Sequence, residues 1–185
     1  MARVALKFMV VRHRKMTADE FLALPPTNGK WELIDGEIIV HDPGLRHQAI
    51  VVWLVRQFAN WTDDHPGSGV AGIGGSWRMP DGKVMAPDVW FLRQERVQPG
   101  DRVVILEGAP DLAVEVRSPN TWEEDCGPKK DRYVALGAEL WLVDTVANVV
   151  LVHRGGERME VTRGQSLSTP LMPGLVIDVT TMFDR

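Results

Sequence analysis

The sequence predicts an α/β (α+β) chain that forms one domain, and three observations support this prediction. The chain has 185 residues, of which 44% are hydrophobic and 25% are charged, as is typical of a globular domain. Residues 45–61 carry apolar side chains at spacings of three and four, which predicts an amphipathic helix. Residues 112–116 and 140–143 are short apolar runs, which predict buried strands.

Composition excludes several classes of protein. The formal net charge of −4 argues against sequence-blind binding of nucleic acid, although it leaves room for a local basic patch. Cys126 is the only cysteine, so neither an intramolecular disulfide nor a cysteine-based zinc site is expected, and a cytoplasmic location is favoured. No apolar run approaches the ~20 residues of a membrane helix, so no membrane association is expected.

Residues 1–15 are expected to form a basic N-terminal arm, and residues 16–185 a single domain. The arm lacks a long apolar run and a small-residue cleavage site, so it is not expected to be a signal peptide. A solvated arm is favoured over a segment that grips phosphates. Two further interpretations are that these residues form a strand, or that they precede a true start at Met9 or Met16. The basic residues are Arg3, Lys7, Arg12, Arg14 and Lys15.

The domain is expected to begin with a short helix over residues 18–24. Thr17 and Glu20 have the spacing of a capping box, in which each side chain satisfies a backbone N–H of the first turn. Pro25-Pro26 cannot continue the helix. The first turn of the domain is therefore predicted from local sequence alone.

A hairpin is predicted next, because Asp35-Gly36 separates apolar runs at residues 31–34 and 37–40. Glu32 shares the face of Ile34. It is either a carboxylate of a functional site or an exposed acid, and the local pattern favours exposure.

His47 lies in the first turn of the helix predicted at residues 45–61. It could ligate a metal or contact phosphate, but a lone histidine there is more often a partly exposed polar residue. The glycines after this helix lack the pattern of a phosphate-binding loop, and no helix follows them. Residues 70–79 are therefore expected to form a glycine-containing strand.

The remaining elements follow from apolar runs and turn residues. Asp125 is expected to cap a helix that runs to Leu136, with Gly137 just beyond its end. Residues 103–106 are either a short edge strand or a loop that covers the site. The other predicted elements are strands at residues 84–88, 89–92, 139–144, 149–153, 158–161 and 175–179, loops at 93–101 and 170–174, and a final helical turn.

Two predicted strands carry acids in apolar surroundings. Asp88 stands at the mouth of the first strand and Glu115 lies inside the second, where a charge is costly unless it is paired or ligates a metal. Alternation places Arg117 on the face of Glu115. Two carboxylates and a cation at one sheet edge suit metal-assisted phosphodiester cleavage. The alternative is that Glu115 and Arg117 form a structural ion pair.

Lys129 is a further candidate, because a lysine near a helix start is unfavourable for the helix dipole. That misfit suggests another role, although a solvated lysine is equally compatible with the pattern. Tyr133 lies four residues later and shares its face.

Several motifs in order resemble the Uma family of bacterial restriction-endonuclease-like proteins. The resemblance spans about residues 16 to 180. The motifs are residues 31–37 (WELIDGE), His47, Pro87-Asp88, residues 111–119 (DLAVEVRSP), Asp125, Lys129, Tyr133, Gly137 and residues 140–144 (LWLVD).

This resemblance implies the PD-(D/E)XK nuclease superfamily, with a restriction-endonuclease-like fold: a central mixed β-sheet flanked by helices. Pro87-Asp88 matches its first half and residues 115–117 its second, but Arg117 stands where a lysine is expected. Arginine cannot take a proton from water, so it cannot serve as a base. The family's replacement is a lysine of the following helix, which corresponds to Lys129. Glu32 and His47 match further positions near the site.

The resemblance therefore implies a Mg²⁺- or Mn²⁺-dependent endonuclease acting on nucleic acid, with DNA favoured. The metal ligands would be Asp88, Glu115 and the carbonyl of Val116. Lys129 would orient water or offset charge, and Glu32 would position a second metal or water. His47 would either hydrogen-bond substrate or act from behind the metal ligands. Arg117 and Tyr133 would support the site.

Restriction-type nucleases often act as dimers, so a homodimer or higher homo-oligomer is expected, with the strands at residues 149–161 as the candidate contact. Two alternatives to an active nuclease remain at this stage. One is a catalytically inactive domain that binds nucleic acid or protein and retains the nuclease fold. The other is a structural protein with a vestigial pocket.

Overall fold

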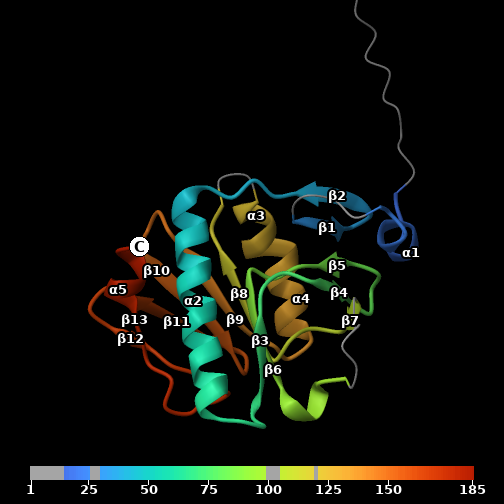
Figure 1. Ribbon diagram of the computed structural model, residues 1–185. Coiled ribbons are helices and arrows are strands. Elements are labelled where there is room, and N and C mark those ends of the chain that lie inside the picture. Colours follow the sequence, from blue (N-terminus) through green and yellow to red (C-terminus); the bar gives the residue numbers. More distant parts are fainter. Residues whose placement is uncertain (1–14, 26–29, 99–104, 119–120) are drawn as a thin grey trace, which may run out of the picture.

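The protein is an α/β molecule in which two β-sheets pack together and helices cover the outer surfaces (Figure 1). The computed structural model describes residues 15–25, 30–98, 105–118 and 121–185. The predicted N-terminal arm lies outside these residues except for Lys15. Within the described ranges, no helix combines the length and apolar character needed to span a bilayer.

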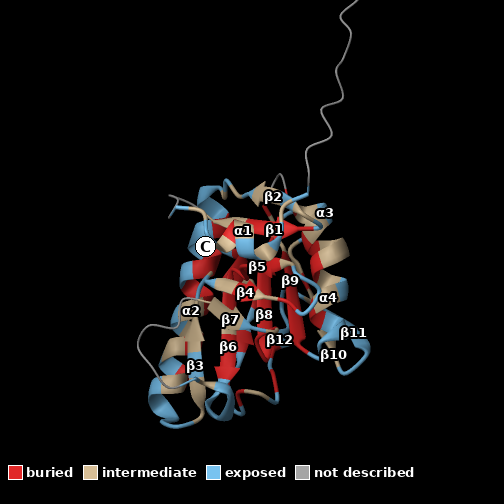
Figure 2. Ribbon diagram, turned by 90° about the vertical axis from the view of Figure 1, so that its right-hand side faces the viewer, coloured by how far each residue is buried: buried red, intermediate tan, exposed pale blue. Residues whose placement is uncertain are grey.

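The larger sheet has six strands and is mixed. Strands β8 and β9 pair in parallel, and the other neighbours pair antiparallel. Its central strands are buried on both faces (Figure 2). From one edge to the other the strands are β11 (Glu157–Thr162), β10 (Val149–Arg154), β9 (Glu139–Asp144), β8 (Leu112–Val116), β6 (Val89–Arg93) and β3 (Gly69–Gly72).

Helix α2 (Leu45–Asp64) covers one face of this sheet (Figure 1). Its residues Ile50, Leu54 and Phe58 are fully buried against the strands, as the apolar periodicity predicts. Burial of side chains of this size contributes about 1.5–3 kcal/mol each. The C-terminal helix α5 (Val179–Phe183) and the short hairpin of β12 (Ser166–Leu167) and β13 (Ile177–Asp178) complete this core.

The smaller sheet packs over the opposite face of the larger one, where Trp77, Met85 and Leu140 share one apolar cluster. Its first two strands form the predicted hairpin, with Asp35 and Gly36 both at positive φ in the turn. The strand order is β2 (Glu37–Val40), β1 (Trp31–Ile34), β5 (Val84–Met85), β4 (Ser76–Arg78) and β7 (Ile105–Glu107).

The single strand predicted at residues 70–79 is wrong. Strand β3 belongs to the larger sheet and β4 to the smaller one. Between them Gly74 and Gly75 have φ values of 55° and 78°, a left-handed conformation that ends an extended strand. The chain therefore passes from one sheet to the other at these two glycines.

The helix capped by Asp125 is also a wrong prediction. The helical segment begins earlier, with α3 (Trp122–Glu124), and continues through the π-helical turn η2 (Asp125–Lys129) into α4 (Lys130–Ala135). The segment is kinked inside η2 at Gly127, whose φ and ψ of −106° are not helical. Asp125 is buried inside this segment because it pairs with a lysine of the next turn. Gly137 follows the helix at φ 77°, as predicted.

The outer elements are short. Helix α1 (Ala18–Leu22) has both hydrogen bonds of the predicted capping box. A 3₁₀ turn η1 (Gln94–Arg96) follows β6. Of the alternatives for residues 103–106, the described residues form strand β7, which pairs in parallel with β4, and residues 99–104 lie outside the described ranges.

Candidate active site

Asp88 and Glu115 meet where β6 begins and β8 ends. The two strands pair antiparallel, so the start of one lies beside the end of the other. Asp88 Oδ1 lies 2.8 Å from the Nζ atom of Lys30, and Glu115 Oε2 lies 3.3 Å from the same atom. The two carboxylates therefore converge on one cation position, which the Lys30 ammonium fills.

The backbone of β8 fixes Asp88 further. The amide of Val116 donates to Asp88 Oδ2 at 2.8 Å, and the amide of Asp88 donates to the carbonyl of Val114 at 3.0 Å. In an antiparallel pair the N–H and C=O groups of one strand residue point to the same side. The carbonyl of Val116 therefore belongs to the strand edge that faces Asp88.

A second cation lies beneath this pair. Lys129 Nζ is 2.8 Å from Glu115 Oε1 and 3.0 Å from Glu32. It is also 2.9 Å from Asp125, one turn earlier in the helical segment. The Lys129 side chain is fully buried, and the hydroxyl of Tyr133 donates to Glu115 Oε1 at 3.1 Å. Glu115 is thus held between two lysines and a tyrosine.

Burial corrects three of the local interpretations. Glu32 is 0% exposed, so the exposed acid favoured by the hairpin pattern is wrong. Its Oε1 accepts from the amide of Ala86 at 2.6 Å, because β1 pairs with β5 just before that residue. His47 and Lys129 are also buried, so neither is the solvated residue that local pattern allowed.

Two histidines complete the group of buried carboxylates, lysines and Tyr133 around Glu115, which we call the cluster. His47 Nε2 lies 3.0 Å from Asp88 Oδ2, and the first turn of α2 positions it there. Its Nδ1 atom is buried and has no hydrogen-bond partner among the described residues. His41 Nε2 lies 2.5 Å from Glu32 Oε2, and its Nδ1 lies 3.4 Å from Thr121 Oγ1.

The three carboxyl groups Glu115, Asp88 and Glu32 lie in different surroundings, and their pKa values are shifted in different directions. Burial raises the pKa of Glu115 to about 8, although Lys129 and Lys30 act in the opposite direction. Burial also works against the charged form of Asp88, but Lys30 and His47 bring its pKa below the ordinary range. Glu32 is likewise buried, yet Lys129 and Lys30 lower its pKa.

The two lysines stay charged. Burial opposes this, but the pKa of Lys30 is raised by Glu115 and Asp88, and that of Lys129 by Asp125 and Glu115. Neither lysine can therefore accept a proton from water near neutral pH.

Arg117 points away from the cluster. Its guanidinium bonds both carboxyl oxygens of Asp144 at 2.9 Å and lies 5.4 Å from the centre of the Trp122 ring. The alternative of an ion pair between Glu115 and Arg117 is wrong, because Glu115 pairs with the lysines instead. The structure therefore brings together all the other predicted site residues: Asp88, Glu115, Lys129, Glu32, His47, Val116 and Tyr133.

Sequence reasoning missed Lys30, His41 and the pairing of Asp125. Lys30 bonds residues 58 and 85 positions away, which no local pattern reveals. His41 had a detectable signal: hairpin register pairs Trp31 with Val40, so the next residues outward are Lys30 and His41. The amide of His41 indeed bonds the carbonyl of Lys30 at 3.0 Å.

The donor set fits a hard divalent cation. Within the described ranges no three histidine, cysteine or acidic side chains form a ready-made metal cage. Mg²⁺, however, is commonly held by one or two carboxylates, with waters and substrate phosphate completing its ligands. Asp88 and Glu115 already share one cation position, and burial raises the pKa of Glu115 in spite of the two lysines beside it.

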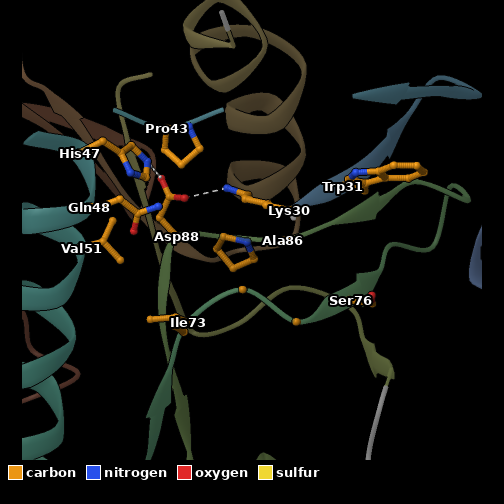
Figure 3. Close-up of a pocket in the computed structure, with 13 residues that line it drawn as sticks. Lys30, Trp31, Pro43, His47, Gln48, Val51, Ile73, Ser76, Ala86 and Asp88 are labelled. Atoms are coloured by element: carbon orange, nitrogen blue, oxygen red, sulfur yellow. Dashed lines mark hydrogen bonds and ion pairs between the residues drawn. The ribbon is translucent and has the colours of Figure 1, made fainter. Parts of the chain in front are cut away.

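A pocket of about 400 Å³ opens beside Asp88, and we call it the side pocket (Figure 3). His47 and Val51 of helix α2 lie on one side of it, and Lys30 and Trp31 on the other. The segment after β3, from Ile73 to Ser76, forms its remaining wall. The side pocket is therefore bounded by segments of both sheets and of α2.

The fold and this cluster of acids and lysines define the class as proteins with a restriction-endonuclease-like fold. A family model described as "Uma2: Putative restriction endonuclease" matches residues 18–180, and the chain belongs to this family. The chain also resembles a crystal structure titled a "putative nuclease belonging to DUF820" from Anabaena variabilis. That match has a TM-score of 0.82 and 22% identity, and it covers 91% of this chain and 98% of the other. No curated protein matches the chain.

Proposed function

We propose that the protein is a metal-dependent endonuclease that hydrolyses phosphodiester bonds of nucleic acid, with DNA as the expected substrate. Family membership and the nuclease-like fold support the class of reaction. The observation that carries the proposal is the convergence of Asp88 and Glu115 on one cation position.

Asp88, Glu115 and the carbonyl of Val116 would hold Mg²⁺ or Mn²⁺. The bound ion would polarise a phosphate oxygen and make a water molecule more acidic. Because the Lys30 ammonium fills the same position, metal binding requires that Lys30 move away. Its side chain is 18% exposed, so it can turn toward solvent and offset negative charge on a phosphate.

Lys129 has a different role in this proposal. It is fully buried and bonded to Glu115, Glu32 and Asp125, so it positions the carboxylates and keeps Glu115 compatible with a charged state. Tyr133 fixes the same Glu115 oxygen. The family resemblance led us to expect that Lys129 acts directly on water or phosphate. We assign this role to Lys30 instead, because Lys30 lines the side pocket.

His47 and Glu32 act on either side of the metal ligands. His47 holds Asp88 through Nε2. Glu32 is bonded to Lys129, His41 and the amide of Ala86, so it is a positioning residue for Lys129. A second metal beside Glu32 would have to replace one of these contacts.

The test is a cleavage assay on supercoiled plasmid, on circular single-stranded DNA and on RNA, each with Mg²⁺ or Mn²⁺. Glu115→Gln should abolish cleavage, as should removal of the metal with a chelator. The matched control is Glu139→Gln, which changes another buried strand glutamate that bonds Arg154 and Thr169 away from the cluster. Circular dichroism confirms that each variant is folded.

Cleavage that persists in folded Glu115→Gln would contradict the proposal. So would a complete lack of cleavage of DNA and RNA with either metal. In the second case the inactive binding domain becomes the better description, because a lysine then fills the metal position permanently.

A further inference from the structure

The side pocket has the lining of a site for a flat apolar group. Pro43, Val51 and Ile73 contribute apolar surface, and Gln48 and Ser76 add polar atoms. Its volume of about 400 Å³ lies within the range of small-molecule sites in proteins. The pocket is therefore large enough for a nucleobase.

Charge divides the pocket into two ends. Among the described residues that line it, Lys30 is the only lysine or arginine, and both Asp88 and Glu115 bind that ammonium. Asp88 and His47 line the same end. A nucleotide whose phosphate lies at the Asp88 end would place an attached base in the apolar remainder, because the base is joined to that phosphate through a single sugar.

The wall of the pocket is held rigidly. The amide of Gly74 donates to the carbonyl of Pro87 at 2.9 Å. The carbonyl of Gly74 accepts from the indole N–H of Trp90 at 3.0 Å and of Trp77 at 3.3 Å. A wall fixed in this way needs little rearrangement when a ligand binds, which lowers the entropic cost of binding.

Ile73 is a large apolar side chain on this wall, yet it is 60% exposed. It lies beside Val51 at the edge of the pocket (Figure 3). An exposed apolar side chain that lines a pocket can be covered by the face of a base, which removes apolar surface from water.

We propose that the side pocket binds an unpaired nucleobase next to the phosphate that is cleaved. This inference rests on the proposed function and adds the substrate class: single-stranded nucleic acid, or a strand with an unpaired base. Bases inside a duplex are stacked and paired, so they must leave the helix before they can enter such a pocket. The net charge of −4 agrees, because binding along a duplex backbone depends on many phosphate contacts.

The test measures binding rather than cleavage. Fluorescence anisotropy would follow labelled 12-mers with the whole protein in Ca²⁺, with electrophoresis to verify that the probes stay intact. The probes are oligothymidylate, oligouridylate, a strand of the same length and charge without bases, and a duplex. Oligothymidylate or oligouridylate should bind about tenfold more tightly than the strand without bases. The tighter of the two identifies DNA or RNA as the source of the base.

Ile73→Ser and Val70→Ser form a matched pair of variants. Both residues are exposed and apolar, and they are three positions apart, but only Ile73 lines the pocket. Ile73→Ser should weaken binding of the base-containing strand about fivefold and leave the strand without bases unchanged. Val70→Ser should change neither.

Equal affinity for strands with and without bases would overturn the inference, and this comparison needs no variant. A duplex that binds as tightly as the single strand and responds equally to Ile73→Ser would overturn it too. If the protein cleaves plasmid but binds strands with and without bases equally, the nucleobase site is refuted and the nuclease activity is retained. If binding depends on bases but nothing is cleaved, the nuclease activity is refuted and base binding by the pocket is retained.

Discussion

Lys30 sets the behaviour of the candidate site at the scale of single residues. Its ammonium bonds both carboxylates that are proposed to hold the metal. If the protein binds a metal as proposed, metal and lysine would compete for one position, and the outcome would depend on metal concentration.

Replacing Lys30 should expose this competition. Lys30→Met should tighten Mn²⁺ binding by about tenfold or more, because like charges a few ångströms apart repel by several times the roughly 1.4 kcal/mol that a tenfold change represents. Isothermal titration calorimetry measures the affinity. The matched control is Lys83→Met, since Lys83 also bonds two carboxylates, Asp35 and Asp81, outside the cluster. Equal or weaker Mn²⁺ binding by Lys30→Met would refute the competition.

Lys129 should matter more for stability than for metal competition. Lys129→Met leaves the buried acids Glu32, Glu115 and Asp125 without their shared cation. Loss of one partner from a buried ion pair costs about 3–5 kcal/mol. Urea unfolding at pH 7 measures the change in the free energy of unfolding.

The neighbouring Lys130→Met is the control for this prediction. The Lys130 side chain is 31% exposed, and its ion pair within the described part of the chain is with the exposed Asp131. Its loss should cost less than about 1 kcal/mol. Similar losses in both variants would mean that the buried cluster does not stabilise the fold.

At this scale the sequence predicted a site residue correctly where a charged side chain stands in an apolar strand. Glu115 stands out because a charged residue occupies an apolar strand, and Asp88 stands out at the mouth of another. Lys30 has no such conflict, because its partners are distant in sequence. Its role could be detected only after the chain had folded.

At the scale of elements, the β1–β2 hairpin positions Glu32. Asp35 and Gly36 occupy the turn with φ values of 50° and 82°, and a Cβ atom at Gly36 would lie 2.5 Å from Cβ of Lys15. The turn is therefore constrained both by its own conformation and by a close neighbour.

Gly36→Ala should consequently destabilise the protein more than Gly82→Ala. Both glycines have φ near 82°, but a Cβ at Gly82 would meet no atom within 4 Å. Each change should cost about 1 kcal/mol for the left-handed conformation, and Gly36→Ala should cost more because of the contact. Thermal unfolding monitored by circular dichroism compares the two. Equal melting temperatures would show that Lys15 moves aside freely.

The elements also show where pattern reading fails. The hairpin was predictable because its turn residues encode its register. The π-helical turn η2 was not, since Gly127-Pro128 signals an interrupted helix but not the wider turn that buries both Asp125 and Lys129. The split of residues 70–79 between two sheets depends on tertiary packing, which a run of strand-forming residues does not reveal.

At the scale of the whole molecule, the overall fold was predictable through the family resemblance, and both the family model and the crystal structure confirm it. The mixed order of the sheet came from that resemblance, because strand pairing is not encoded in local patterns. The homodimer, the cytoplasmic location and the identity of the metal stay predictions.

The free energy of unfolding should depend on pH, because the carboxyl groups of the cluster have shifted pKa values. Burial raises the pKa of Glu115 from 4.5 to about 8, so between these values the native state keeps a proton that the unfolded state releases. The metal-free protein should therefore lose up to about 1.4 kcal/mol of stability per pH unit over this range from Glu115. Asp88 and Glu32 have lowered pKa values, so their contribution is lost at acid pH instead.

If Mn²⁺ binds Glu115, it competes with the proton on this carboxyl group. The proton is lost more readily at pH 8 than at pH 6, so Mn²⁺ should raise the melting temperature more at pH 8. Differential scanning calorimetry at both pH values, with and without Mn²⁺, measures this difference. A larger stabilisation at pH 6 would contradict the assignment of Glu115 as a ligand.

The cluster draws its side chains from residue 30 to residue 133 and from both sheets. A chain still emerging from the ribosome lacks Lys129 and Tyr133 until more than two thirds of it has been made, and the two carboxylates cannot be fixed together before then. If the protein cuts nucleic acid as proposed, a copy that is unfinished or misfolded lacks the assembled site. The hazardous chemistry is thereby postponed until every side chain of the cluster has been synthesised and folded into place.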